Sequence, residues 1–331
     1  MSLAIRFHSL GGPEVISVDE VDVRAPRAGE VRIRTRALGL NRADVMFRTG
    51  NHFSQPTFPQ AFGLEAAGVV EALGPGVTGL TVGDAVSVVP ATPLTEYPLF
   101  GDLVLAPARA VVQHPATLSF EVAASLWMAY TTAYGGLVDV AGLAAGDTVA
   151  ISAASSSVGL AAIEIANAVG ATPIAITRTH AKRQQLLDAG AHAVLATDTG
   201  DVTDSLNDVT NGAGAQVIFD PVAGPPLAGL MNAAATGAIV VVYGALDAEP
   251  TPLPILPLLQ RRLRIRGYDM AEVTTDDTRL DEAVTFIRAG LESRALNPTI
   301  DAVYDLADIA DAYRHLESGG QFGKVVIRMP S

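Results

Sequence analysis

The sequence predicts an α/β protein in two parts: a small β-barrel or folded sheet, followed by a doubly wound, six-stranded parallel sheet. The first third is strand-like and rich in turns, whereas from about residue 120 apolar strands alternate with helical segments. At 331 residues the chain is long enough for two domains.

The first part is predicted from alternating apolar and polar side chains. Residues 1–6 have the pattern of a strand, and Val31–Ala37 alternates as a half-buried strand does. Two further strands, 68–73 and 85–89, are separated by turn signals such as Gly74-Pro75-Gly76. Several short strands in this arrangement favour a small barrel or a folded sheet.

The second part is predicted from apolar strands that alternate with helices. The expected strands are 147–153, 173–177, 193–196, 215–219, 238–243 and 263–268, and the expected helices are 158–169, 180–189, 201–210 and 226–235. Residues 239–243 are almost wholly apolar, as in a strand covered on both faces. Six strands with intervening helices predict a nucleotide-binding domain.

The end of the chain predicts two amphipathic helices, 277–289 and 306–317, and a closing strand, 324–328. The proline-rich stretch 250–254 is too short for a linker between domains, so we expect a loop before the last strand of the sheet.

Composition excludes several classes of function. The chain has no cysteine, so it has neither a disulfide framework nor a thiolate metal site. The net charge of −13, without a basic cluster, argues against nucleic acid as a partner. No apolar run approaches the roughly 18 residues that span a bilayer, and the N-terminus lacks the features of a signal peptide. We therefore expect a cytoplasmic protein without a membrane partner.

A serine-rich turn joins the first predicted strand of the parallel sheet to its helix. It comprises Ser155, Ser156, Ser157, Val158 and Gly159. The unpaired N–H groups and the positive dipole end of such a helix can bind a pyrophosphate. Gly159 would let the helix pack closely on the sheet. The alternative is a plain N-cap, because serine is strongly preferred there and the usual Gly-x-Gly-x-x-Gly is missing.

The end of the next strand indicates which dinucleotide binds. NAD-specific proteins generally carry an acidic residue at this point, whereas this chain has Arg178, Thr179 and Lys182. These side chains could bind a 2′-phosphate, so we expect NADPH rather than NADH as the cofactor. The alternative is a solvated basic start to a helix, which the helix dipole disfavours.

Several segments, in order along nearly the whole chain, resemble the zinc-independent quinone oxidoreductases (zeta-crystallin-like) of the medium-chain dehydrogenase/reductase superfamily. They are Leu38-Gly39-Leu40-Asn41-Arg42-Ala43-Asp44-Val45-Met46-Phe47-Arg48-Thr49-Gly50, Gly63-Leu64-Glu65-Ala66-Ala67-Gly68-Val69-Val70, Val82-Gly83-Asp84-Ala85-Val86, Tyr130-Thr131-Thr132-Ala133-Tyr134, Ser157-Val158-Gly159-Leu160-Ala161, Asp188-Ala189-Gly190-Ala191 and Phe322-Gly323-Lys324-Val325-Val326.

The resemblance implies a domain arrangement. It implies a GroES-like catalytic domain at 1–122, a Rossmann NADP-binding domain at 123–268 and a C-terminal return to the catalytic domain at 269–331, with the active site in the cleft between the domains. It also implies a homodimer, paired through the sheet edge near 263–268.

The resemblance also implies the positions of site residues. Asn41 and Thr132 would lie by the nicotinamide, and the turn 155–159 would hold the pyrophosphate. Lys182 would reach the 2′-phosphate. The nicotinamide side of the sheet would be lined by Val222-Ala223 and Gly244-Ala245, and the terminal segment adds Gly323 and Lys324 as expected cofactor contacts.

Residue types disfavour a metal at this site. The zinc branch of the superfamily uses cysteine and histidine ligands, and its His-Glu pair is Leu64-Glu65 here. The six histidines show no close metal-ligand spacing. Without a Lewis acid, oxidation of a simple alcohol is difficult.

Reduction of an electron-poor acceptor is easier, because a quinone or an α,β-unsaturated carbonyl delocalises the incoming negative charge onto oxygen. The small-molecule partner that we expect is such an electrophilic acceptor. The hypothesis is hydride transfer from nicotinamide C4, with Asn41 orienting the acceptor or the cofactor, and with water or a side chain supplying the proton.

Three departures from the family pattern bear on this hypothesis. Ser156 replaces the middle glycine of the phosphate turn, and Met46 and His52 replace two tyrosines that many relatives carry beside the substrate. His52 could donate a proton near neutral pH. The alternative is a surface histidine in a turn-rich loop.

Two different functions also remain compatible with the sequence: the enzyme could be an enoyl-thioester reductase, or the chain could bind NADPH without catalysis. Locally, Asp44 and Arg48, four residues apart, are expected to form an ion pair that braces a short helix. Tyr130 and Tyr134 share a helical face and are either core or pocket lining.

Overall fold

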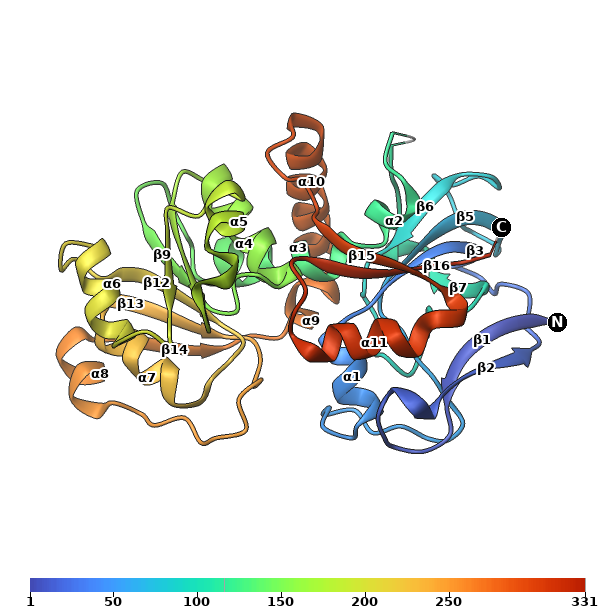
Figure 1. The fold of residues 1–331 in the computed structure, drawn as a ribbon. Helices are drawn as coiled ribbons and strands as arrows, with labels where there is room; N and C mark the ends of the chain where they lie inside the picture. The colour runs from blue at the N-terminus through green and yellow to red at the C-terminus, as the bar shows by residue number, and fades with distance from the viewer. Residues whose placement is uncertain (116, 331) are drawn as a thin grey trace. The chain divides into compact units, whose positions relative to one another are not determined.

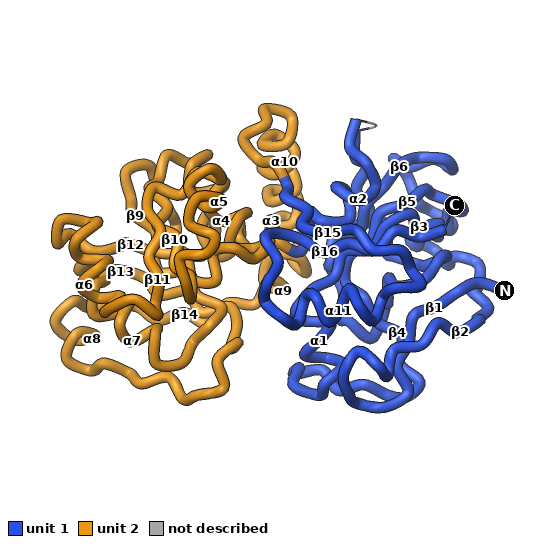
Figure 2. The backbone as a smooth tube through the Cα atoms, viewed as in Figure 1, with its two compact units in different colours: residues 1–128, 298–331 blue, residues 129–297 orange. Residues whose placement is uncertain are grey.

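The chain forms two units in the computed structural model, which describes residues 1–115 and 117–330. Unit 1 comprises residues 1–128 and 298–331, and unit 2 comprises 129–297 (Figure 2). The return to unit 1 therefore comes at 298, later than the expected 269. Helices α9 (Ala271–Thr274) and α10 (Asp277–Ser293) belong to unit 2, where the Phe286 ring packs on Tyr134 at 5.1 Å between centroids.

Unit 1 is built from two sheets. The larger sheet has the order β15-β16-β3-β5-β6-β8, and β7 pairs with β3 off this path. Its strands are β3 (Glu30–Gly39), β5 (Ala66–Leu73), β6 (Ala85–Val88), β7 (Leu103–Pro107), β8 (Val111–Gln113), β15 (Ile300–Asp305) and β16 (Lys324–Arg328). The smaller sheet, β2-β1-β4, contains β1 (Ser2–Phe7), β2 (Ile16–Val21) and β4 (Gln60–Ala61).

Alternation explains these strands. Val31 and Ile33 of β3 are fully buried, whereas Arg34 is exposed, so one face of the strand meets the core. The strands predicted at 31–37, 68–73, 85–89 and 324–328 are confirmed. The helices of unit 1 are α1 (Arg42–Arg48), α2 (Phe120–Ala123) and α11 (Ile309–Ser318), with 3-10 segments at Pro13–Val15, Ala108–Ala110 and Leu306–Asp308.

Unit 2 contains a six-stranded, all-parallel sheet of order β11-β10-β9-β12-β13-β14 (Figure 1). The strands are β9 (Thr148–Ile151), β10 (Thr172–Thr177), β11 (Ala193–Ala196), β12 (Ala215–Asp220), β13 (Ala234–Val242) and β14 (Arg264–Gly267). All six predicted strands are confirmed. The strand order reverses at β9 and β12, and ligands bind such sheets at this switch point, beyond the carboxyl ends of the strands.

Helical segments cover both faces of this sheet. They are α3 (Trp127–Tyr134, which begins in unit 1), the π-helical Gly135–Val140, α4 (Ser157–Ala168), the 3-10 turn His180–Lys182, α5 (Arg183–Asp188), α6 (Val202–Val209), α7 (Gly224–Asn232) and α8 (Ile255–Arg261). On one face Ile218 and Val240 pack in one core cluster with Leu206 of α6 and Leu227 of α7. On the other face the Phe219 ring lies against Gly136.

Helix α8 was not predicted from the sequence. The proline-rich stretch 250–254 is a loop, as expected, but a helix follows it directly. Pro257 lies in the first turn of that helix, where a missing N–H costs little. No helix in the described parts of the chain combines the length and apolar composition needed to cross a membrane.

Helix α1 is anchored by a buried arginine, but not through the expected partner. The prediction of an Asp44–Arg48 pair is wrong: the fully buried Arg48 side chain forms an ion pair with Glu317 and donates to the Gly11 carbonyl at 3.0 Å. Its guanidinium also lies 5.4 Å from the centre of the Tyr313 ring. These contacts fix α1 against α11, and with it the position of Asn41, the residue that precedes α1.

Candidate active site

Asn41, the central residue of the sequence-based hypothesis, lies in a buried polar cluster of unit 1. Its side-chain Oδ1 accepts a hydrogen bond from Lys324 Nζ at 2.7 Å, and the same ammonium donates to Glu65 Oε2 at 2.6 Å. Asn41 is 6% exposed, and the Lys324 and Glu65 side chains are 1% and 0% exposed. Lys324, expected as a cofactor contact, is thus held inside the protein by an ion pair.

Asp44 adds a second carboxyl group to this region. Its Oδ2 accepts the backbone N–H of Asn41 at 2.8 Å, which holds the start of α1 in place. Complete burial raises the pKa of Asp44 to about 7, although the Asn41 N–H and the charge of Lys324 oppose the rise and that of Glu65 adds to it. Near neutral pH the Asp44 carboxyl is therefore a mixture of its protonated and ionised forms.

His52 and Met46 occupy partly exposed positions on or just after α1. His52 Nδ1 faces the backbone N–H of Ser54 at 3.0 Å, so Nδ1 accepts and the neutral ring carries its proton on Nε2. The ring packs on Phe53, with 4.0 Å between centroids. A proton-donating role for His52, which requires the imidazolium form, remains a prediction.

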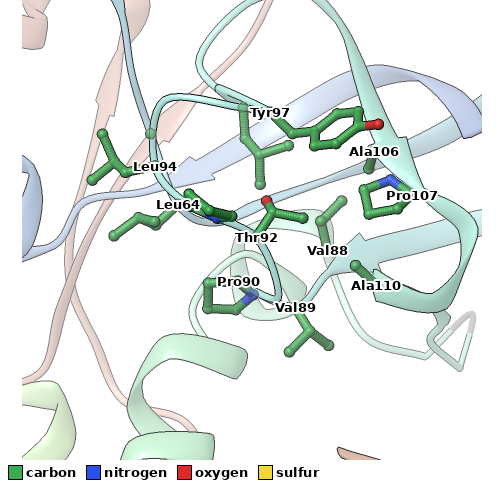
Figure 3. A pocket seen from close by; sticks show the side chains of 13 residues that line it. Leu64, Val88, Val89, Pro90, Thr92, Leu94, Tyr97, Ala106, Pro107 and Ala110 are labelled. Carbon is green, nitrogen blue, oxygen red and sulfur yellow. The ribbon is translucent and has the colours of Figure 1, made fainter. Parts of the chain in front are cut away.

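An apolar hollow opens in unit 1 beside the segment that contains Leu64 (Figure 3). It is small: the space open to a water-sized molecule is about 10 Å³, room for roughly one water. Its lining comes from Gly63, Leu64, Val88, Val89, Pro90, Thr92, Pro93, Leu94, Tyr97, Leu99, Ala106, Pro107 and Ala110. The polar side chains are Thr92 and Tyr97, and the Tyr97 hydroxyl donates to Glu30 at 3.0 Å. Among the residues that the structure describes, no lysine or arginine lines the hollow.

In unit 2 the serine-rich turn lies between β9 and α4, as the sequence predicted. Ser156 is the N-cap of α4: its Oγ accepts the Gly159 N–H at 3.1 Å. A Cβ on Gly159 would lie 2.6 Å from the Ala154 backbone, so only glycine permits this approach of helix to strand end. Ser155, Ser157 and Val158 are partly exposed at the positive end of the helix.

The basic residues predicted to bind a 2′-phosphate follow β10. Arg178 and Thr179 are exposed, and Thr179 Oγ1 accepts the Ala181 N–H at 3.3 Å as the cap of a 3-10 turn. Lys182 reaches back to the phosphate turn, where its Nζ donates to Ser155 Oγ at 3.3 Å. The structure thus brings Lys182 and Ser155 together, and their binding of one dinucleotide stays a prediction.

The segments predicted to line the nicotinamide follow β12 and β13. Gly244 lies so close to Pro221 that a Cβ would be 2.7 Å from its carbonyl oxygen, and the Asp247 N–H donates to the Val222 carbonyl at 2.9 Å. Ala245 is exposed beside them. Val222, Gly244 and Ala245 therefore lie on adjoining turns at the carboxyl edge of the sheet.

Asp220, which was not among the residues expected from the sequence, shapes these turns. Its buried Oδ2 accepts N–H groups of Val222 at 3.1 Å and Ala223 at 2.6 Å. Burial raises the pKa of the Asp220 carboxyl, which the Ser152 hydroxyl and these two N–H groups counteract. Ala223 has φ 62° and ψ −144°, a conformation used almost only by glycine that costs about 1–3 kcal/mol. The available sequence signal was an aspartate three residues before Ala223.

Thr132 is 6% exposed and lies on α3. Its helix is fixed by the neighbouring Thr131, whose carbonyl accepts the Tyr268 hydroxyl at 3.3 Å. The Tyr130 hydroxyl donates to Glu164 at 2.6 Å, and burial raises the pKa of both groups. Tyr130 is therefore a core residue with a buried polar partner.

Gly323 precedes β16 in unit 1. It has φ 103°, and a Cβ there would lie 2.4 Å from the Thr299 carbonyl oxygen. Glycine is required at this position by the backbone of unit 1 itself. A role for Gly323 toward a cofactor remains a prediction.

Comparison with known proteins identifies the family. One family model, the alcohol dehydrogenase GroES-like domain, matches residues 27–116, and another, zinc-binding dehydrogenase, matches 157–289. The quinone oxidoreductase of Lama guanicoe is 30% identical over 326 residues, which cover 98% of this chain and 96% of that protein. The chain is a medium-chain dehydrogenase/reductase.

Solved structures agree with this assignment of the medium-chain dehydrogenase/reductase. The Escherichia coli quinone oxidoreductase, complexed with NADPH, is 26% identical with a TM-score of 0.88 and covers 98% of this chain and 99% of its own. An NAD-dependent alcohol dehydrogenase is 31% identical with a TM-score of 0.91 and covers 99% and 100%. The expected fold, a GroES-like domain with a Rossmann sheet, is confirmed.

The residues of this medium-chain dehydrogenase/reductase do not fit the zinc named in one family model. The chain has no cysteine, and Leu64 carries no ligand atom. The adjacent Glu65 carboxylate is paired with Lys324. Within residues 1–115 and 117–330, no group of three or more histidine, aspartate or glutamate side chains is placed to hold a metal ion.

The residues do fit a dinucleotide. Helix α4 presents its N-terminus beyond β9, at the switch point of the sheet, and glycine at 159 allows the close turn. Lys182 and Arg178 supply positive charge beside that turn. Bound there, a nicotinamide dinucleotide would supply a hydride from its ring.

The pKa of Asp44 gives a prediction about stability. The native carboxyl keeps its proton up to about pH 7, whereas the unfolded one loses it near 3.8. Because the native state binds the additional proton between these values, this group lowers stability as pH rises from about 4 to 7. Asp44→Asn removes the titration and keeps an oxygen for the Asn41 N–H.

We therefore expect the free energy of unfolding of Asp44→Asn, relative to wild type, to increase by about 2–3 kcal/mol between pH 5 and pH 8. Urea denaturation at both pH values measures this difference. Asp204→Asn, an exposed aspartate on α6, serves as the control and should show no such change. Parallel pH dependences for wild type and Asp44→Asn would contradict the prediction.

Proposed function

We propose that this protein is a zinc-independent, NADPH-dependent reductase that transfers hydride to a quinone or an α,β-unsaturated carbonyl. The observation that carries the proposal is the ion pair at Glu65. Glu65 directly follows Leu64, the position where the zinc branch of the family has its histidine. Here the Glu65 carboxylate accepts a hydrogen bond from the Lys324 ammonium at 2.6 Å. The site therefore offers hydrogen bonds and no place for a Lewis acid.

Hydrogen bonds suffice for an acceptor that spreads negative charge. A quinone or enone receives hydride at carbon while the charge moves to oxygen, and a preorganised N–H donor stabilises that oxygen. Asn41 supplies an amide at the edge of the buried cluster and orients the acceptor or the cofactor. Water, or His52 in its protonated imidazolium form, supplies the proton that completes the reduction.

The apolar lining of the small hollow beside Leu64 favours an uncharged acceptor. None of its described lining side chains is basic, so it offers nothing to the phosphates of an acyl carrier. This favours a quinone or an alkenal over an enoyl thioester.

The first prediction concerns turnover. We expect loss of NADPH absorbance with 1,4-benzoquinone, 1,2-naphthoquinone or a 2-alkenal, slower turnover with crotonyl-CoA, and no effect of a metal chelator. Asn41→Ala should lower kcat/KM by about 100-fold, because the loss of one such donor costs that much in comparable sites.

The control is Asn51→Ala, which removes an exposed asparagine that hydrogen-bonds to Thr49. Tight NADPH binding without turnover of any acceptor would reject the reductase and favour a protein that binds NADPH without catalysis. Preferred turnover of crotonyl-CoA would favour an enoyl-thioester reductase.

The second prediction concerns the coenzyme, for which the NADPH-bound and NAD-dependent relatives differ. Arg178→Ala should raise KM for NADPH about 10-fold or more and leave KM for NADH nearly unchanged, since a charge-assisted hydrogen bond to phosphate contributes about 1.5–3 kcal/mol. Steady-state kinetics with both coenzymes tests this. Arg288→Ala, an exposed arginine of α10, is the control. Equal effects on both coenzymes would refute 2′-phosphate recognition.

We also propose a homodimer through the β14 edge. All four residues of β14 are exposed at the end of the sheet, and Leu256 and Leu259 of α8 are 69% and 67% exposed. Such an edge favours pairing with another strand. Light scattering should show a dimer for wild type and for Val303→Glu, and a monomer for Leu256→Glu/Leu259→Glu. A monomeric wild type would overturn this proposal.

A further inference from the structure

Two neighbours determine how the Asn41 amide is oriented. Lys324 Nζ lies 2.7 Å from Oδ1, and the Gly39 carbonyl oxygen lies 2.9 Å from Nδ2. An ammonium has no lone pair to accept a hydrogen bond, so it must face the amide oxygen. A carbonyl has no hydrogen to donate, so it must face the amide nitrogen. Both neighbours therefore require the same orientation, and a flipped amide would lose both bonds.

Lys324 is itself held in one position. Its ammonium donates to Glu65 Oε2 at 2.6 Å, and the other carboxylate oxygen of Glu65 accepts the Met128 N–H at 3.2 Å. The absence of a side chain at Gly39 makes room for the pair: a Cβ there would lie 2.9 Å from Glu65 Oε2 and 3.0 Å from Lys324 Cε.

Three neighbouring strands place these residues. Asn41 follows β3 by two residues, Glu65 directly precedes β5, and Lys324 begins β16. β3 pairs with both of the other strands: Leu38 lies opposite Ala66 of β5, and Gly39 lies opposite Val326 of β16. The register of the central sheet thus brings the three residues of the cluster together.

We propose that Lys324 is a positioning residue that commits Asn41 to act as a hydrogen-bond donor in the reductase site. With Oδ1 facing Lys324 and one Nδ2 hydrogen facing Gly39, the second Nδ2 hydrogen is what the amide offers to a ligand. This inference rests on the proposed function for its catalytic consequence. It narrows the role of Asn41, because the group opposite Asn41 must be an acceptor oxygen, either of the substrate carbonyl or of the cofactor.

The test needs a variant that removes the ammonium without leaving a buried carboxylate unpaired. Lys324→Met alone would leave the Glu65 carboxylate buried and unpaired. Such a variant can fail to fold, since an uncompensated buried charge is strongly destabilising. Lys324→Met/Glu65→Met replaces both charges by flexible apolar side chains. Asn41→Asp is the complementary variant, because it keeps an oxygen for Lys324 and removes the N–H donor.

The first readout is independent of activity. In protein labelled with ¹⁵N-asparagine, the Asn41 side-chain signals are assigned by their loss in Asn41→Ala. We expect slow hydrogen exchange for the Asn41 amide in wild type and fast exchange in Lys324→Met/Glu65→Met, with circular dichroism unchanged. Unchanged exchange in the double variant would overturn the positioning role.

The second readout is single-turnover hydride transfer, with NADPH affinity measured by fluorescence titration. We expect both variants to lose about 100-fold in the rate of hydride transfer, with a much smaller change in NADPH affinity. A wild-type rate in Asn41→Asp would refute the donor role even if the double variant fails to fold. If wild type reduces no acceptor, the proposed function fails, while the exchange measurement still decides whether Lys324 orients Asn41.

Discussion

The buried ion pair between Lys324 and Glu65 is the interaction on which the candidate site depends. Two charges removed from water are tolerated only when each is paired and hydrogen-bonded, and here each side chain has a second partner, Asn41 for the ammonium and the Met128 N–H for the carboxylate. Lys324 comes from the last strand of the chain, β16, whereas Asn41 and Glu65 lie beside β3 and β5. The polar cluster is therefore complete only after the chain has returned from unit 2 and added β15 and β16 to the sheet.

The strands and most helices could be predicted because the local pattern of apolar and polar residues indicates which side chains are buried. Val31–Ala37 alternates because one face of β3 is in the core, and 239–243 is apolar because β13 is covered on both faces. The partner of Arg48 could not be predicted, because spacing within a helix favours Asp44 while the fold brings Glu317 closer. Helix α8 was not predicted, because Pro257 interrupts the helical pattern in the sequence, although proline is tolerated in the first turn of a helix.

The residues expected to bind the dinucleotide were easier to place on elements of the fold than to assign local roles. The turn 155–159 follows β9, and from the sequence capping and phosphate binding were alternatives for it. In the structure Ser156 caps the helix, while Ser155, Ser157 and Val158 stay partly exposed at the same helix end, so the two roles do not exclude each other. The strained turn at Ala223 lacks glycine at its positive-φ residue, which is the usual signature of such a turn, so Asp220 was the one sequence signal for it. Asp220 compensates for that missing signal with two hydrogen bonds that only the folded backbone reveals.

The charges around Asn41 account for the kind of chemistry that this site favours. Lys324 contributes one positive charge, while Glu65 and Asp44, both fully buried, would contribute two negative ones. Burial raises the pKa of Asp44 to about 7, so at neutral pH and below the cluster approaches zero net charge. A neutral cluster leaves the Asn41 amide as a fixed dipole of defined direction. Such a dipole stabilises charge on an oxygen without reorganising, which suits acceptors that delocalise charge and falls short of what a simple alcohol requires.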